Sequence, residues 1–233
     1  MADLSNGSET RYIKVHPPIV RVMHWLNAIA VIVMIGSGWR IYNNVPIFDW
    51  LIFPQWATLG GDPEITYKLN ADTGFSNALL WHFAAMWLFF INGTAALIYG
   101  FASGRIGSRW FPVSISALIH DFKEALSFRL AHEDPTIYNS VQRLSYIGVV
   151  LAAFMVFLSG LAIWKPVQFQ TLTWLMYDFQ GARLVHFLSM AAIVLFLVVH
   201  VSLAFLVPKT LVGMTLGRIA AKKSETPHMQ PGE

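Results

Sequence analysis

The chain of 233 residues is 55% hydrophobic and only 12% charged, a composition that excludes an ordinary soluble domain and indicates an integral membrane protein. It contains no cysteine, which excludes thioether-linked haem, protein-ligated iron–sulfur clusters, thiolate zinc sites and disulfides. The formal net charge is +3, but the basic residues flank apolar stretches as topology signals do, so we expect no nucleic-acid partner.

Four apolar stretches are each long enough to cross a hydrocarbon core about 30 Å thick. We expect residues 1–18 to be a polar cytoplasmic leader rather than a signal peptide, because no small-residue cleavage pattern follows the first apolar stretch. Residues 19–207 form the membrane domain, and residues 208–233 form a polar, basic tail. We therefore predict an all-α integral membrane protein, a four-helix bundle with spans at about 19–41, 78–101, 144–164 and 185–207.

The connections between the spans differ in charge. Residues 43–77 are acidic and rich in aromatic residues, whereas residues 105–143 are basic. In the basic connection, apolar residues recur at helical spacing and predict an amphipathic helix on the membrane surface: Ile115, Leu118, Ile119, Phe122, Leu126 and Leu130. The positive-inside rule places both termini and this connection in the cytoplasm. We therefore expect a multi-pass protein of the bacterial inner membrane whose acidic connection is periplasmic.

Histidines in three of the four spans define two depths. His186 and His200 are fourteen residues apart in the last span, so on a helix both rings leave the same face, about 21 Å apart along the axis. The predicted topology places His186 near the periplasmic side and His200 near the cytoplasmic side. By the same topology, His82 in the second span is periplasmic and His24 in the first span is cytoplasmic. The four histidines thus form two pairs at matching depths.

Two pairs of histidines at two depths are what two six-coordinate b-type haems require, because each iron takes two axial imidazoles. We predict that His24 and His200 ligate the iron of a cytoplasmic-side haem b. His82 and His186 would ligate the iron of a periplasmic-side haem b. Hydrogen bonding across the bundle is the alternative for any single histidine. It accounts less well for four ionisable groups matched in depth, since each is costly to bury in lipid.

Two glycines and two arginines are further candidates for the haem sites. Gly38 and Gly93 fall on the histidine faces of their helices but at the opposite depth, where they would leave room for the other haem; helix packing explains them equally well. Arg21 and Arg183 each precede a histidine by one turn and would pair with haem propionates, or else anchor the helix at the membrane interface. We expect the remaining histidines to be solvated: His16, His120, His132 and His228.

A family resemblance is carried by the segments Arg21-Val-Met-His24-Trp25, Tyr138-Asn-Ser-Val-Gln142-Arg143 and Arg183-Leu-Val-His186, together with the lone histidine early in the second span and His200. Over residues 12–220, approximately, the chain resembles the membrane cytochrome b subunits of nickel-iron hydrogenases, formate dehydrogenases and thiosulfate reductases, a superfamily that also includes bacterial cytochrome b(561). The resemblance implies a diheme protein that passes electrons between a periplasmic oxidoreductase and the quinone pool, with quinone near the cytoplasmic-side haem. It also implies that the four paired histidines are the axial ligands.

The resemblance also implies partners. We expect a periplasmic oxidoreductase subunit, a molybdopterin enzyme in preference to a nickel-iron hydrogenase, and quinone as substrate. The long first connection is the expected docking surface, with a membrane-interface belt of aromatic residues as the alternative. A homodimer or a larger respiratory complex stays open. The candidates for the quinone site lie at the start of the third span, where a surface cap is an equal alternative: Asn139, Gln142 and Arg143.

Two other functions stay open from the sequence. A stand-alone cytochrome b would exchange electrons between quinone and superoxide or another small oxidant, without a protein partner. A histidine-relay transporter or proton channel would need no haem. A relay has no need of two ligands at each of two depths, so it explains the pairing of the histidines poorly.

Overall fold

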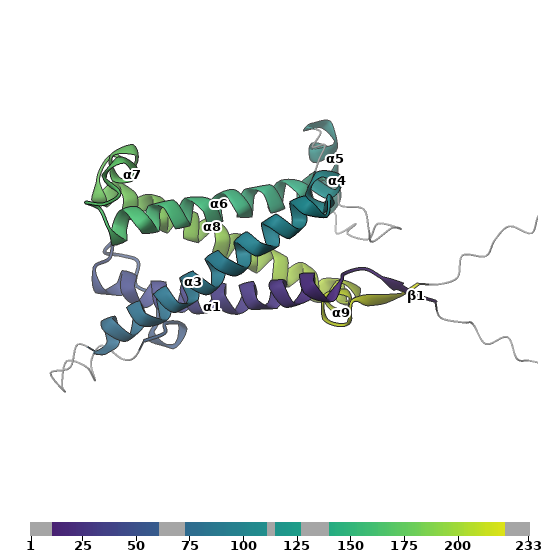
Figure 1. Cartoon of the computed structure of the whole chain (residues 1–233), viewed down its shortest axis with the longest axis horizontal. Helices are drawn as coiled ribbons and strands as arrows, with labels where there is room; N and C mark the ends of the chain where they lie inside the picture. The colour runs from purple at the N-terminus through teal and green to yellow at the C-terminus, as the bar shows by residue number, and fades with distance from the viewer. Residues whose placement is uncertain (1–10, 61–72, 111–114, 127–139, 222–233) are drawn as a thin grey trace, which may run out of the picture.

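Four long apolar helices dominate the computed structural model, which describes residues 11–60, 73–110, 115–126 and 140–221 (Figure 1). They are α1 (Pro18–Asn44), α3 (Thr73–Ala102), α6 (Ser140–Trp164) and α8 (Phe179–Leu206). By length and composition, each can cross a membrane. The predicted all-α bundle of four membrane-crossing helices is therefore confirmed.

The ends of these helices follow local signals that hydropathy does not include. Pro18 opens α1 at a position where its fixed backbone angle suits a helix and its missing N–H costs nothing. Asp178 caps α8, because its side chain accepts a hydrogen bond from the Gly181 amide at 2.7 Å. This cap explains why α8 begins at Phe179, well before the expected start at residue 185.

The helices associate as two pairs. Close backbone approaches are concentrated between α1 and α3 and between α6 and α8, and they are sparse between one pair and the other. In the first pair, Asn92 donates to the Met23 carbonyl at 2.7 Å and to the Asn27 side chain at 2.8 Å. Small side chains at helix contacts are fully buried, as is usual in membrane bundles: Ala30, Ser37, Ala78, Ser159, Ala162 and Ala182.

One end of the bundle, which we call the tail end, holds a small sheet. Strand β1 (Arg11–Lys14) pairs antiparallel with β2 (Arg218–Ala221), and helix α9 (Pro208–Leu216) leads into β2. Gly217 ends α9 with a φ of 76°, a conformation that favours glycine. The leader and the tail, expected as separate polar segments, are thus joined. His16, expected to be solvated, is instead part-buried in this region.

The opposite end, which we call the loop end, is covered by residues 45–60 folded back over α1 (Figure 1). The side-chain amide of Asn43 exchanges two hydrogen bonds with the backbone of Phe53, at 2.7 and 3.0 Å. Farther along, the Leu59 amide donates to the Gly36 carbonyl at 2.9 Å, about two turns inside the end of α1. The short helices η1 (Gln55–Ala57) and α7 (Gln170–Leu175) also lie at this end.

The expected amphipathic helix is present as α5 (Ile115–Leu126), which follows the short helix α4 (Arg105–Trp110) at the tail end (Figure 1). Leu130, the last residue of the predicted apolar face, lies outside the described residues. Asp121 of α5 accepts a hydrogen bond from the Ser140 amide at 2.7 Å and so caps the start of α6. Partial burial acts to raise the pKa of Asp121, but the hydrogen bonds from Ser140 and His120 outweigh it and hold the pKa below its usual value.

Candidate functional site

Two pairs of histidine rings face each other across the space between the helix pairs. The rings of His24 on α1 and His200 on α8 have centroids 6.2 Å apart; we call them the tail-end pair. The rings of His82 on α3 and His186 on α8 have centroids 6.3 Å apart; we call them the loop-end pair. The structure therefore brings the four histidines together as two pairs, one toward each end of α8.

The spacing within each pair suits two imidazoles on opposite sides of one metal ion. Nitrogen–metal bonds of about 2.0 Å on both sides would place two ring centroids roughly 6 Å apart. Two buried side-chain donors have no hydrogen-bond partner among the described residues, and the carboxylates of a haem would accept from them. These donors are Nε of Arg21, one turn from His24, and Nε1 of Trp39, which is adjacent in sequence to Gly38 beside His82. The residues at both pairs thus fit a haem.

Two serines contact the loop-end pair in the same way. Oγ of Ser37 on α1 lies 3.1 Å from Nδ1 of His82, and Oγ of Ser159 on α6 lies 3.1 Å from Nδ1 of His186. The glycine after each serine lets the ring approach, since a Cβ on Gly38 would lie 3.3 Å from Cε1 of His82. A Cβ on Gly160 would lie 3.4 Å from Cε1 of His186. Each helix pair therefore supplies one histidine and a Ser-Gly step that holds it.

An aromatic cluster forms at the loop end and includes the residue that follows His186 in sequence. Phe187, which follows His186, stacks on Tyr42 of α1 with centroids 5.1 Å apart. Phe48 and Phe53 from the folded-back segment complete the cluster against Phe187 and Tyr42. The folded-back segment therefore packs aromatic side chains against α1 and α8 at this end of the bundle.

The tail-end pair has different surroundings. The His200 ring stacks on Phe196 with centroids 5.4 Å apart, and His24 meets the edge of Trp25 at 5.3 Å. Among the described residues, no hydroxyl lies against either ring as Ser37 lies against His82. Trp25 donates weakly to the Met214 carbonyl of α9 at 3.4 Å, which ties this pair to the joined leader and tail.

The two candidate arginines hold backbone segments near their histidines. Arg21 donates through Nη1 to the Thr215 carbonyl at 2.5 Å, at the end of α9. Arg183 donates to the Gln180 side chain at 2.8 Å and also to the Val45 carbonyl. Their predicted contact with haem propionates stays a prediction.

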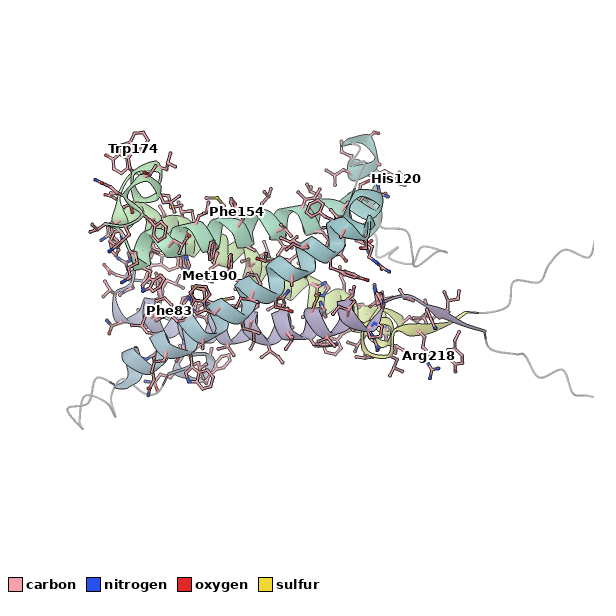
Figure 2. The ribbon with its side chains drawn as sticks, in the orientation of Figure 1. Phe83, His120, Phe154, Trp174, Met190 and Arg218 are labelled. Atoms are coloured by element: carbon pink, nitrogen blue, oxygen red, sulfur yellow. The ribbon has the colours of Figure 1, made fainter. Side chains whose placement is uncertain are left out.

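The other predicted site residues are placed as follows. Gly93 faces open space, since a Cβ added there would have no atom within 4 Å, whereas Gly38 abuts the His82 ring. Gln142 and Arg143 lie in the first turn of α6 at the tail end, where each already has contacts of its own. Asn139 lies outside the described residues, as do His132 and His228. His120 is on α5 with its side chain 70% exposed, as expected (Figure 2).

Sequence reasoning missed Ser37 and Ser159. A signal was present, because a Ser-Gly step recurs in the first and third spans, at 37–38 and at 159–160. A His-Phe step recurs in the second and fourth spans, at 82–83 and 186–187. These two recurring dipeptides indicate that the α6 and α8 pair repeats the arrangement of the α1 and α3 pair. Serine and glycine by themselves are common in membrane helices and carry no such signal.

Comparison with known proteins identifies the family of this chain. The model of a family described as prokaryotic cytochrome b561 matches residues 15–217. The chain is also 42% identical over 203 residues to the putative protein-methionine-sulfoxide reductase subunit YedZ1 of Azospira oryzae, an alignment that covers 87% of this chain and 96% of that protein. The predicted family resemblance is confirmed, and the family implies that haem b is bound. The chain belongs to the prokaryotic cytochrome b561 family and is a membrane electron-transfer subunit.

Proposed function

We propose that this cytochrome holds two b haems and carries electrons across the bacterial inner membrane between the quinone pool and a periplasmic oxidoreductase. The observation that carries the proposal is the pairing of four histidines, with ring centroids 6.2 and 6.3 Å apart. When bound, haem b supplies one-electron redox chemistry. Helix α8 contributes one histidine to each pair, so a single rigid element fixes the separation of the two sites.

The histidines and their surroundings would hold the two haems in apolar sites away from water. In this proposal His24 and His200 would hold the iron of one haem, and His82 and His186 would hold the iron of the other. Arg21 and Arg183 would pair with propionates at the two ends. The space open at Gly93 would admit part of the tail-end haem. Gly38, which lies against the His82 ring, would leave room at the loop-end site.

The distribution of charge supports an orientation for these sites. Basic residues concentrate near the tail end, on α4 and beside β2, which supports a cytoplasmic location for that end and for both termini. The loop end would then face the periplasm. We place the quinone site at the tail end near His24 and His200, with Gln142 and Arg143 of α6 and Asn139 before it as candidate contacts.

The identity of the periplasmic partner is inferred from the name of the relative YedZ1, and its docking site is inferred from the exposed aromatic side chains at the loop end. YedZ1 is named as a putative subunit of a protein-methionine-sulfoxide reductase, and we propose a reductase of that class as the partner, in place of a hydrogenase. The molybdopterin class stays our expectation for its cofactor. Large aromatic side chains point away from the bundle at the loop end, including Trp174 (Figure 2). They provide an apolar surface for docking: Trp50, Trp56, Trp174 and Tyr177.

Haem content tests the central part of this proposal. A pyridine haemochrome assay on the purified chain should give about two b haems per polypeptide. One haem or none would refute the diheme assignment, and a colourless protein would favour a histidine relay. Co-purification from native membranes tests the partner separately, since a stand-alone cytochrome would bring no periplasmic subunit with it.

A further inference from the structure

We propose that Ser37 and Ser159 are positioning residues that fix both loop-end histidines with the proton on Nδ1, leave both Nε2 atoms for iron, and lower the reduction potential at that site. The proposal rests on the proposed function, because it requires a haem between His82 and His186. Nothing in the family description or in the relative's name assigns a role to either serine.

Each serine hydroxyl donates its proton to a backbone carbonyl of its own helix. Ser37 donates to the Val33 carbonyl at 2.7 Å, and Ser159 donates to the Met155 carbonyl at 2.6 Å, in each case four residues earlier in the same helix. A hydroxyl has one hydrogen to donate and lone pairs that accept. Each serine can therefore only accept from the histidine nitrogen that lies 3.1 Å away.

The histidine nitrogens must then be donors. With Nδ1 protonated in a neutral imidazole, Nε2 keeps the lone pair, and a metal ligand needs that lone pair. The two serines thus give His82 and His186 the same arrangement, in which Nδ1 donates to Oγ and Nε2 is left for a metal ion.

Burial makes the contact strong. Ser37 and Ser159 are both 0% exposed, so water does not compete for either hydrogen bond. An acceptor on the second nitrogen of a metal-bound imidazole fixes the orientation of the ring and raises its basicity. A more basic axial ligand favours the oxidised iron and so lowers the reduction potential. The tail-end pair has no equivalent hydroxyl contact among the described residues, so the effect would be confined to the loop end.

Ser145 provides a matched control. It lies on α6, as Ser159 does, and donates to the Val141 carbonyl four residues earlier at 2.8 Å, but it makes no hydrogen bond to a histidine of the described part of the chain. Substituting it removes the same type of hydroxyl and the same backbone contact. A difference between Ser159→Ala and Ser145→Ala therefore reports the histidine contact alone.

The experiment is a spectroscopic redox titration of the purified full chain, with electron paramagnetic resonance of the oxidised form. The wild type is compared with the S37A/S159A double variant, with each single variant and with Ser145→Ala. We expect the double variant to keep two haems and to shift one of them to a higher potential. At a fixed potential, the ratio of oxidised to reduced haem should change roughly tenfold. For one electron this change corresponds to a shift of about 59 mV in the reduction potential. The g values of that haem should change as well.

The outcomes separate this proposal from the proposed function. Repeating the titration in a His24→Ala background, which should retain only the loop-end haem, identifies which haem moves. Loss of the loop-end haem alone in the double variant would also support the proposal, because it would show that the serines are needed to position His82 and His186 for binding. Unchanged potentials and g values, equal shifts of both haems, or loss of both haems would overturn it. A wild-type protein with fewer than two haems would refute the diheme function instead.

Discussion

The two ends of the bundle hold their histidines by different means. At the loop end, both rings lie against buried serines, and an aromatic cluster that includes Phe187 packs between α1, α8 and the folded-back segment. At the tail end, the rings of His24 and His200 pack against Trp25 and Phe196, close to the joined leader and tail. Under the proposed function, the hydrogen-bonded site would hold the haem that faces the partner protein. The site packed by apolar side chains would hold the haem that exchanges electrons with quinone.

Substitution of one of the paired histidines should have the largest effect, because it should remove the haem at one end of the bundle and leave the haem at the other end. We expect His82→Ala to lose only the loop-end haem and His200→Ala to lose only the tail-end haem. Each variant should retain about one b haem per chain, because each iron depends on its own two imidazoles. The pyridine haemochrome assay measures this. The control is His120→Ala, whose side chain is 70% exposed on α5 and should leave both haems in place. Loss of both haems from either single variant would contradict independent sites.

Filling the space beside His82 should have the next largest effect. A Cβ at Gly38 would already lie 3.3 Å from Cε1 of His82, so Gly38→Val should displace the ring and cost about 1–3 kcal/mol in packing. Occupancy of the loop-end haem should fall, and the tail-end haem should be unaffected. Gly148→Val is the matched control, since nothing lies within 4 Å of a Cβ there. Equal losses in both variants would mean that helix propensity, rather than the ring contact, sets the result.

At the tail end, Arg21→Gln should produce a smaller and local change. The variant loses the hydrogen bond to the Thr215 carbonyl and a positive charge one turn from His24. We expect faster hydrogen exchange in β1 and β2 and a lower potential for the tail-end haem only, because a nearby cation favours the reduced, less positive iron. Arg218→Gln is the control, since that side chain lies over Tyr12 in the small sheet. A shift of the loop-end haem in Arg21→Gln would argue against its assigned location.

The smallest expected effect is on the contact between α5 and α6. Asp121→Ala removes the cap on the Ser140 amide and should lower the free energy of unfolding by about 1 kcal/mol at neutral pH. The pKa of Asp121 is held low in the folded protein, so its contribution is present above the unfolded pKa of about 3.9 and disappears as the pH falls through the folded pKa. Thermal unfolding in detergent, at neutral pH and in acid, checks this. A difference that persists in acid would show that the carboxylate is not the cause.

Much of the architecture could be predicted from local sequence. Hydropathy located all four membrane-crossing helices, and helical periodicity with topology grouped the four histidines by depth. The ends of the helices were harder to predict from hydropathy, because the cap at Asp178 starts α8 among polar residues that a hydropathy search leaves out. The pairing of β1 with β2 could not be predicted, since two four-residue strands at opposite ends of the chain carry too little pattern.

The serine contacts needed the folded structure. A serine in a membrane helix most often bonds to its own backbone, as Ser145 does, and nothing in the first span alone relates Ser37 to a histidine 45 residues later. Only the packing of α1 on α3 and of α6 on α8 places each hydroxyl against an imidazole. Once that packing is known, the recurrence of Ser-Gly and His-Phe in the sequence becomes informative.

A redox titration of the wild-type chain, followed in its visible spectrum, most directly tests the proposal that the chain holds two b haems with different reduction potentials. Two one-electron b-haem transitions should appear with separate midpoints, and the component that survives in His24→Ala should be the one with the lower potential. A single transition from one haem per chain, or a surviving component with the higher potential, would contradict two bis-histidine sites that differ as the two ends of this bundle differ.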